Sequence, residues 1–151
     1  MSRIQHILFP TDFSPNAKTA WPFVKKLIEK NNAKFTLLHV LDVPLMVSVN
    51  DVAKGEHLSL NIEEHMQAMT MDHFDDLIRD NHLIKENHDA IMLEGNVIDS
   101  INKTVSEESI DLVIMGTKGK SARNGLLMGS ITKGVLEQVT CPVLAVPDSA
   151  L

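Results

Sequence analysis

Residues 111–132 read DLVIMGTKGKSARNGLLMGSIT, and this stretch contains four of the chain's seven glycines. The run Asp111–Met115 is mostly apolar and ends at Gly116, which is typical of a buried strand that leads into a loop. The glycines that follow permit positive φ and let backbone N–H groups approach an anion without an intervening Cβ. Gly129 and Ser130 open a segment with helical spacing, and a helix N-terminus favours phosphate. The stretch therefore predicts a strand, a phosphate-binding loop and a helix.

The alternation of strands and helices extends toward both ends of the chain. Short apolar runs predict the other strands, which are Ile4–Phe9 stopped by Pro10, Phe35–Val40, Asp89–Glu94 and Pro142–Val146. Apolar residues at helical spacing predict four helices. The first runs from Ser14-Pro15 to Asn31-Asn32, and the third covers Val97–Val105. The second begins near Leu58 and has a stripe of Ile62, Met66, Met69, His73, Leu77 and Ile78, and the last carries Ile131, Val135, Leu136 and Val139. Residues 41–60 are less regular and predict a loop before the long helix.

This order predicts the fold class. Continuous apolar strands separated by helices indicate a parallel sheet that is covered on both faces, which is a doubly wound α/β domain. No repeat, low-complexity tract or linker divides residues 1–151, so we expect a single domain. Ligands of such folds bind beyond the carboxyl ends of the strands, where the strand order reverses. The segments Pro10–Asp12 and Gly116–Gly119 are therefore the expected site.

Composition excludes several classes of function. The 151 residues carry a net charge of -6 and include one tryptophan and no tyrosine, which argues against a nucleic-acid groove. No apolar run approaches the ~20 residues of a membrane span, and the N-terminus lacks the pattern of a signal peptide, so we expect a cytoplasmic protein. The single cysteine, Cys141, allows no intrachain disulfide. His57, His65 and His73 are eight residues apart, too far around a helix to share a metal ion, so we expect structural histidines and no dedicated metal site.

Two common nucleotide-binding motifs do not fit. A P-loop requires glycine five residues before the glycine of Gly119-Lys120-Ser121, and that position is Ile114. The dinucleotide fingerprint is absent after the first strand, which leads into Pro10-Thr11-Asp12.

The spacing that does occur is Gly116, two residues, Gly119, nine residues, Gly129 and Ser130. It resembles the signature of the ATP-binding branch of the universal stress protein family. The resemblance covers nearly the whole chain, through Ile7–Ser14, Leu38–Val40, Asp111–Gly116 and Cys141–Val146. It implies a five-stranded parallel sheet of order 3-2-1-4-5, similar to the adenine nucleotide alpha hydrolases. It also implies a homodimer that pairs through the last strand, Val143–Val146.

The resemblance further implies roles for individual residues. Those expected to line the phosphates and ribose are Gly116, Gly119, Gly129, Ser130, Ile131 and Thr132. Those expected around the adenine and ribose are Pro10, Thr11, Asp12 and Val40, with Met115 beside the base. Magnesium or manganese would be held through the phosphates, and Lys118, Lys120 and Arg123 could offset phosphate charge. Gly125 and Gly134 match no position of the signature and are expected to serve a local turn and helix packing.

The sequence leaves three functions open. The first is an ATP-binding regulator of the stress response, in which nucleotide stabilises one state of the dimer. The second is a slow ATPase with at most weak turnover, because no general base is recognisable and no catalytic residue is assigned. The third is a nucleotide-free dimeric interaction module, with residues 41–60 as a loop for an unidentified regulatory partner. Whether ATP, AMP or another nucleotide is preferred, and which stress is involved, also stays open.

Overall fold

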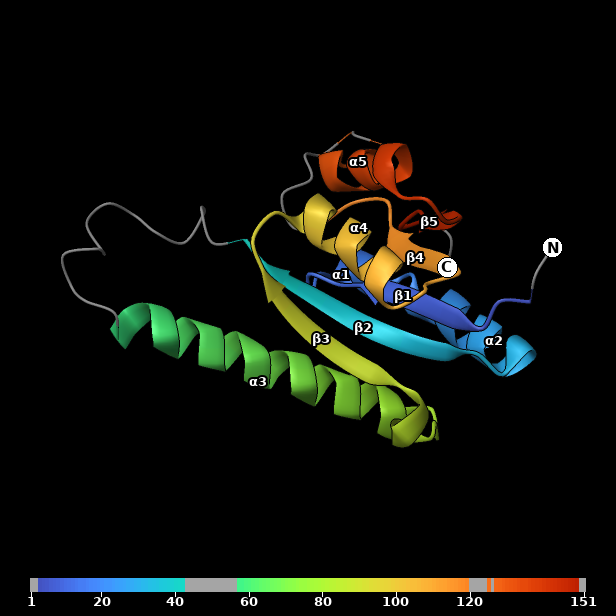
Figure 1. Cartoon of the computed structure of the whole chain (residues 1–151), viewed down its shortest axis with the longest axis horizontal. Helices are drawn as coiled ribbons and strands as arrows, with labels where there is room; N and C mark the ends of the chain where they lie inside the picture. The colour runs from blue at the N-terminus through green and yellow to red at the C-terminus, as the bar shows by residue number, and fades with distance from the viewer. Residues whose placement is uncertain (1–2, 43–56, 120–124, 126, 150–151) are drawn as a thin grey trace.

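The computed structural model describes residues 3–42, 57–119, 125 and 127–149. Five parallel strands form one sheet in the order β3-β2-β1-β4-β5, as the sequence predicts (Figure 1). The strands are β1 (His6–Pro10), β2 (Lys34–Leu41), β3 (Asp89–Glu94), β4 (Leu112–Gly116) and β5 (Val143–Val146). The helices are α1 (Pro15–Lys18), α2 (Trp21–Asn31), α3 (His57–Asp80), α4 (Val97–Glu107) and α5 (Ser130–Gln138), with a 3-10 turn, η3 (Lys85–Asn87), before β3.

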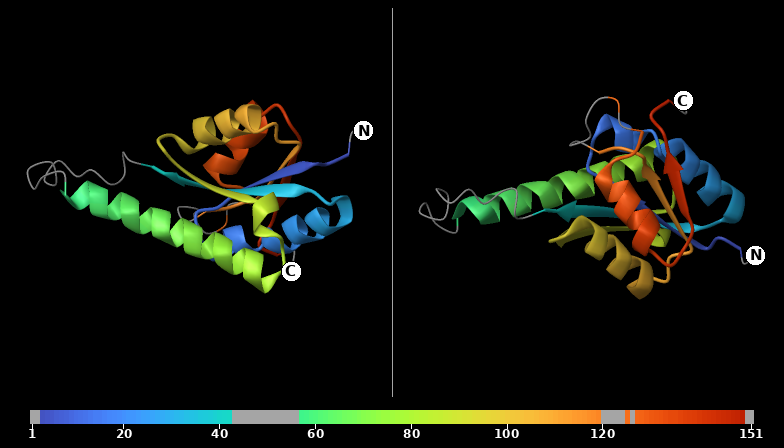
Figure 2. Two further views of the ribbon diagram at one scale, coloured as in Figure 1. Left: turned by 60° about the horizontal axis from the view of Figure 1, so that its bottom comes forward. Right: turned by 90° about the horizontal axis from the view of Figure 1, so that it is seen from above.

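Helices cover both faces of the sheet (Figure 2). On the face of α1, α2 and α3, the core includes Phe9, Phe35 and Phe74. On the face of α4 and α5, it includes Leu8 and Ile101. Alternate residues of each strand supply the two cores, so the strands are mainly apolar, and this confirms the doubly wound α/β class.

The first predicted helix is in fact two helices. Ser14 caps α1 as expected, since its hydroxyl accepts a hydrogen bond from the N–H of Ala17 at 3.1 Å. At Thr19 and Ala20 the backbone bonds run from residue i to i−3, and α2 begins at Trp21 with Pro22 in its first turn. Proline has no N–H and its ring clashes with the preceding turn, so a continuous helix through this point is wrong. Asn32 ends α2 in the left-handed conformation, with φ 51°.

The stripe predicted on α3 is also partly wrong. Thr70, Phe74 and Ile78 are its buried residues, whereas Met69 is 38% exposed. These three lie four residues apart, which is the spacing of one helical face. No helix in the described part of the chain, α3 included, is both long and apolar enough to cross a membrane.

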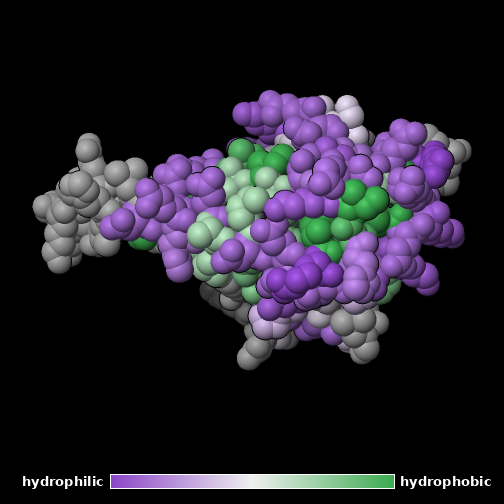
Figure 3. Space-filling view, turned by 90° about the horizontal axis from the view of Figure 1, so that it is seen from below, coloured by the Kyte–Doolittle hydropathy of each residue, from purple (hydrophilic) through white to green (hydrophobic). Residues whose placement is uncertain are grey.

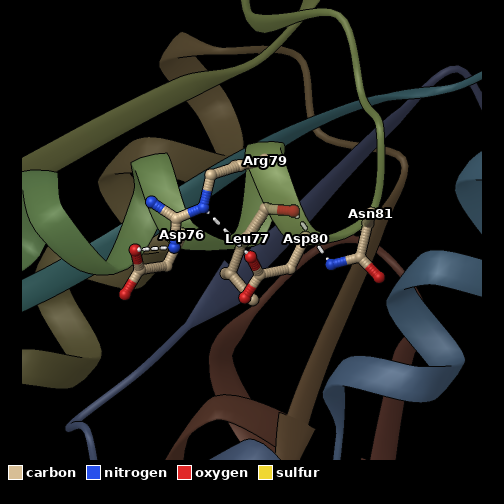
Figure 4. A network of polar contacts seen from close by, with 5 residues as sticks. All are labelled: Asp76, Leu77, Arg79, Asp80 and Asn81. Carbon is tan, nitrogen blue, oxygen red and sulfur yellow. Dashed lines mark hydrogen bonds and ion pairs between the residues drawn. The ribbon is translucent and has the colours of Figure 1, made fainter.

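Hydrogen bonds and ion pairs link side chains at the C-terminal end of α3 (Figure 4). The side-chain amide of Asn81 donates to the carbonyl of Leu77 at 2.8 Å. The guanidinium of Arg79 donates to Asp76 at 2.7 Å and to Asp80 at 3.2 Å, and these contacts raise its pKa. The one basic side chain of the helix is thereby paired with carboxylates.

Each edge strand leaves one row of backbone groups without a neighbouring strand. The N–H of Gly95 donates to Leu41, and backbone direction alternates along a strand, so Ala90 and Met92 turn their N–H groups away from β2. On β5, the carbonyl of Pro142 accepts from Val113, so the N–H groups of Val143 and Ala145 turn away from β4. In the described part of the chain, neither row has a strand partner.

Two glycines are required by packing. A Cβ on Gly116 would lie 2.7 Å from the backbone carbonyl oxygen of Asn16, so the end of β4 can approach α1 only without a side chain. A Cβ on Gly134 would collide with the side chain of Ile98, where α5 crosses α4. Gly125 has φ 87°, the left-handed region that glycine favours. The expectation that Gly125 and Gly134 serve a turn and helix packing is confirmed.

We expect Gly116→Ala to lower the free energy of unfolding by about 1–3 kcal/mol, because backbone atoms must move to admit the methyl group. Gly129→Ala is the matched control: its Cβ would lie 3.5 Å from the nearest atom, and its φ of -76° suits alanine. Urea denaturation of both variants measures the difference. Equal stability of the two variants would show that α1 can retreat without cost.

Two histidines are buried at the end of the sheet where the strands begin. The ring of His6 contacts the carbonyl of Glu108 at 2.9 Å and the hydroxyl of Thr36 at 2.7 Å. His88 Nδ1 accepts a hydrogen bond from the N–H of Phe35 at 3.0 Å, which requires that nitrogen to be unprotonated. Burial lowers the pKa of both histidines. For His6 the hydrogen bond to the Glu108 carbonyl opposes this effect in part, and for His88 the nearby Lys34 lowers the pKa further against a smaller opposing effect of Asp89.

Because folding lowers these pKa values, the unfolded chain binds protons more readily, and the free energy of unfolding should fall as the pH drops below about 6.5. In His88→Asn, the amide oxygen can still accept from Phe35 but does not titrate, so the loss should be smaller. His82→Asn is the control at an exposed position. Urea titrations between pH 7.5 and 5.5 test this. An unchanged pH dependence in His88→Asn would contradict it.

Candidate functional site

The candidate site lies where β1 and β4, neighbours at the centre of the sheet, reach their carboxyl ends. The chain after β1 enters α1, and the chain after β4 leads toward α5 on the opposite face (Figures 1 and 2). Connections that leave in opposite directions create the crevice in which doubly wound folds bind ligands. The structure thus brings together the two segments that the sequence selected.

The segment after β1 is held by its own polar side chains. The N–H of Thr11 donates to Leu38 at 2.9 Å, which extends the ladder beyond β1. The Thr11 hydroxyl accepts from the N–H of Phe13 at 3.1 Å, and the Asp12 carboxylate accepts from the N–H of Ser14 at 2.9 Å. Phe13 itself has φ 62°, which is uncommon for a bulky residue. Non-glycine strain of this kind gathers at functional sites.

The Phe13 ring connects this segment to β2 and α3. Its centroid lies 4.5 Å from that of the His39 ring and 5.4 Å from that of the His73 ring. His39 is buried, and its Nδ1 lies 2.9 Å from the carbonyl oxygen of Thr11. Burial lowers the pKa of His73, and Lys18 lowers it further, so a neutral ring is favoured there.

The segment after β4 closes against the segment after β1. A Cβ on Gly119 would lie 2.6 Å from Asp12 Oδ2, so the carboxylate reaches the glycine backbone. The N–H of Gly129 donates to the carbonyl of Thr117 at 2.7 Å, which brings the N-terminus of α5 beside the end of β4. Gly129 is the N-cap of α5, and no side chain caps that helix.

Two threonine hydroxyls near β4 differ in their partners. Thr132 donates its hydroxyl to the carbonyl of Gly116 at 3.0 Å, which fixes α5 to the strand. Thr117 is 8% exposed, and its hydroxyl oxygen is buried without a hydrogen-bond partner among the described residues. A buried hydroxyl without a partner costs about 1–3 kcal/mol, so it calls for an explanation. Sequence reasoning did not select Thr117, although its place between Gly116 and Gly119 would have indicated it.

The other predicted site residues occupy the same end of the sheet. Thr11, Met115 and Thr132 are buried, Val40 and Ile131 are half-buried against the core on the α4 and α5 face, and Ser130 is exposed at the start of α5. Pro10 is the last residue of β1 and pairs with Leu38.

Two expectations for the glycine-rich segment are modified. Gly116, Gly119 and Gly129 do not use the left-handed φ that glycine permits; only Gly125 does so in this segment among the residues described. Lys118 lies 3.5 Å from Asp148, so its charge is shared with a carboxylate. Lys120 and Arg123 lie outside the described residues. Where side chains are described, no three histidine, cysteine or acidic residues are placed to hold a metal ion.

Comparisons with known proteins agree with this arrangement. Residues 3–147 match the model of the universal stress protein family. The chain is 28% identical to universal stress protein MJ0577 of Methanocaldococcus jannaschii, over 93% of each chain. A solved structure of MJ0577 superposes with a TM-score of 0.80 at 25% identity, covering 99% of this chain and 100% of that one.

Two more distant structures share the fold. One is a universal stress protein in complex with cAMP, with a TM-score of 0.69 and 19% identity over 98% of this chain and 100% of that one. The other is a family protein from Arabidopsis thaliana with AMP bound, with a TM-score of 0.64 and 16% identity over 97% and 93%. With the strand order, the two facing segments and the matching family model together, the chain belongs to the universal stress protein family.

Proposed function

We propose that the chain binds ATP at the carboxyl ends of β1 and β4 and acts as a nucleotide-dependent regulator in the stress response. One observation carries the proposal: Thr117 has a buried hydroxyl with no partner among the described residues, and the carbonyl of the same residue accepts from Gly129 at the N-terminus of α5, which no side chain caps. A phosphate group would accept from both the hydroxyl and the helix N–H groups.

The segment after β1 supplies the complementary part of the site. Asp12 holds the N–H of Ser14 through one carboxylate oxygen, while the other faces Gly119. A carboxylate there would accept hydrogen bonds from nucleotide hydroxyl or amino groups. Val40, half-buried at the end of β2, would offer an apolar surface to the base. A bound magnesium or manganese ion would take its ligands mainly from phosphate oxygens.

The relatives support an adenine nucleotide. Two family structures are described with cAMP and with AMP, which share the adenine, the ribose and a phosphate with ATP. The preference for a triphosphate in this chain rests on the Gly116, Gly119, Gly129 and Ser130 spacing, which resembles the ATP-binding branch.

Calorimetric titration of nucleotide-free protein with ATP and magnesium should show saturable binding. Thr117→Val should weaken ATP binding roughly tenfold, as expected for one lost hydrogen bond to a charged group. The same variant should keep its free energy of unfolding, because no protein partner loses a bond. Thr140→Val, at an exposed position after α5, is the control and should bind like the parent.

The variants separate binding from folding. Thr132→Val should lower stability, because its hydroxyl is bonded to Gly116. Gly119→Val should weaken binding by displacing Asp12. If the parent protein gives no saturable heat with ATP, AMP or cAMP, nucleotide binding is excluded.

We also infer that two copies of the chain pair through β5. The strand is at the edge of the sheet, its residues Val143, Leu144 and Ala145 are half-buried, and the N–H groups of Val143 and Ala145 face outward. An apolar edge strand of this kind tends to pair with another strand, and pairing with a second copy would give its outward N–H groups hydrogen-bond partners. In the order of the sheet, this edge strand lies beside β4.

Light scattering should give twice the chain mass of 16.8 kDa for the parent protein. Ala145→Pro removes one outward N–H without breaking the bonds to β4, so it should shift the protein to the monomer mass. Ala90→Pro is the matched control, because it removes an outward N–H from the other edge strand and should leave the dimer intact. A dimer that survives Ala145→Pro but not Ala90→Pro would place the interface at β3 instead.

A further inference from the structure

The other edge of the sheet differs from β5 in charge and in shape. Residues 57–94, from the start of α3 to the end of β3, include nine acidic and two basic residues, a net charge of -7, whereas the rest of the chain together carries +1. Figure 3 views the molecule from this side, and hydrophobic surface appears in the middle of the face with hydrophilic side chains around it. The acidity of the chain therefore belongs to the α3 and β3 side.

A groove of about 170 Å³ lies between α3 and β3. Its lining comes from α3 and from the residues of β3 that face α3, and consists of Glu63, Gln67, Thr70, Met71, Ala90 and Met92. Methionine side chains are flexible and polarisable, so they adapt to guests of different shape. The groove is thus mixed in character: Met71, Ala90 and Met92 supply its apolar part, and Glu63, Gln67 and Thr70 supply its polar part.

The backbone beside the groove has free hydrogen-bonding capacity. Ala90 and Met92, which line the groove, are also the residues whose N–H and carbonyl groups turn away from β2. The four central residues of β3, Ala90 to Leu93, are only half-buried although all are apolar. The side chains of an added strand would cover part of these apolar residues on each face of the sheet.

The few basic residues near the groove pair with aspartates and do not neutralise the remaining carboxylates of this region. Arg79 is held by Asp76 and Asp80 (Figure 4). Lys85 is held by Asp75 at 2.6 Å. Lys34 pairs with Asp89 at the start of β3. No ion pair among the described residues involves Glu63 or Glu94, and these two carboxylates flank the groove and the end of the strand.

We propose that the β3 edge and its groove bind an extended basic segment of another protein, which adds a strand beside β3. Backbone pairing with Ala90 and Met92 provides the attachment, an apolar side chain enters the groove, and Lys or Arg side chains meet the carboxylates. A second copy of this chain does not fit, because it would bring two regions of net charge -7 together. Nucleic acid is excluded at this face by its own negative charge.

The probe is a fluorescent peptide, Lys-Val-Lys-Val-Lys-Val-Lys, with blocked ends, and anisotropy should show saturable binding that weakens with salt. Glu63→Lys combined with Glu94→Lys should weaken binding roughly tenfold. Glu107→Lys combined with Glu137→Lys makes the same change of net charge on α4 and α5, and it should alter binding by less than about twofold. Equal losses in the two double variants would mean attraction by overall charge alone and would overturn the proposal.

Strand pairing is tested separately. A peptide of the same charge with proline in place of its two outer valines should not bind, because proline cannot donate to a ladder. Bound peptide should slow amide hydrogen exchange at Ala90 and Met92, while Ile91 and Leu93, already bonded to β2, should change little. Binding of the proline peptide with equal affinity, or protection located elsewhere, would overturn the proposal. So would a peptide-free dimer that Ala90→Pro dissociates, since a second copy would then occupy this edge.

Discussion

The pairing of β1 with β4 is the constraint on which the molecule depends. Both strands are buried along their whole length, and they lie in parallel with Ile7 beside Leu112. At the opposite end from the candidate site, the Asp111 carboxylate accepts from the N–H groups of Gln5 and His6 at 2.8 and 2.9 Å, which fixes the relative position of the strands. At the site end, the close approach of Gly116 to Asn16 sets the distance between β4 and α1. Strands held at both ends place the Asp12 and Gly119 segments opposite one another.

The architecture follows closely from the hydrophobic pattern, because a strand buried on both faces has few polar positions to interrupt it. The apolar runs at Phe35–Val40 and Asp89–Glu94 fall within one residue of the observed strands. Helix boundaries are harder to predict, because hydrophobic periodicity does not show where a backbone N–H is missing. The apolar spacing runs through Pro22 without a sign that the helix must restart there. On α3, a methionine side chain can lie in the core or at the surface. The apolar spacing therefore placed Met69 on the buried stripe, whereas the structure exposes Met69 and buries Phe74.

At the candidate site, spacing selected two segments that the fold brings together, but it did not give the structural role of each residue. Gly116 looked like part of an anion cradle, yet its missing side chain is required by Asn16 on a helix that is distant from it in sequence. Thr117 is a candidate site residue only because its hydroxyl oxygen is buried without a partner among the described residues. That property depends on packing and cannot be inferred from the order of residues. Gly134 and Ile98 show the same limit, since helix crossing depends on contacts between separate segments.

The Phe13 ring, set between His39 of β2 and His73 of α3, supports the segment after β1 from outside that segment. A residue with left-handed backbone and a large side chain cannot rotate in place without pushing on both rings. Sliding of α3 along the sheet would therefore turn the peptide units on either side of Phe13, and these include the one next to Asp12. The aromatic contact thus links the position of α3 to the backbone conformation of the loop that follows β1.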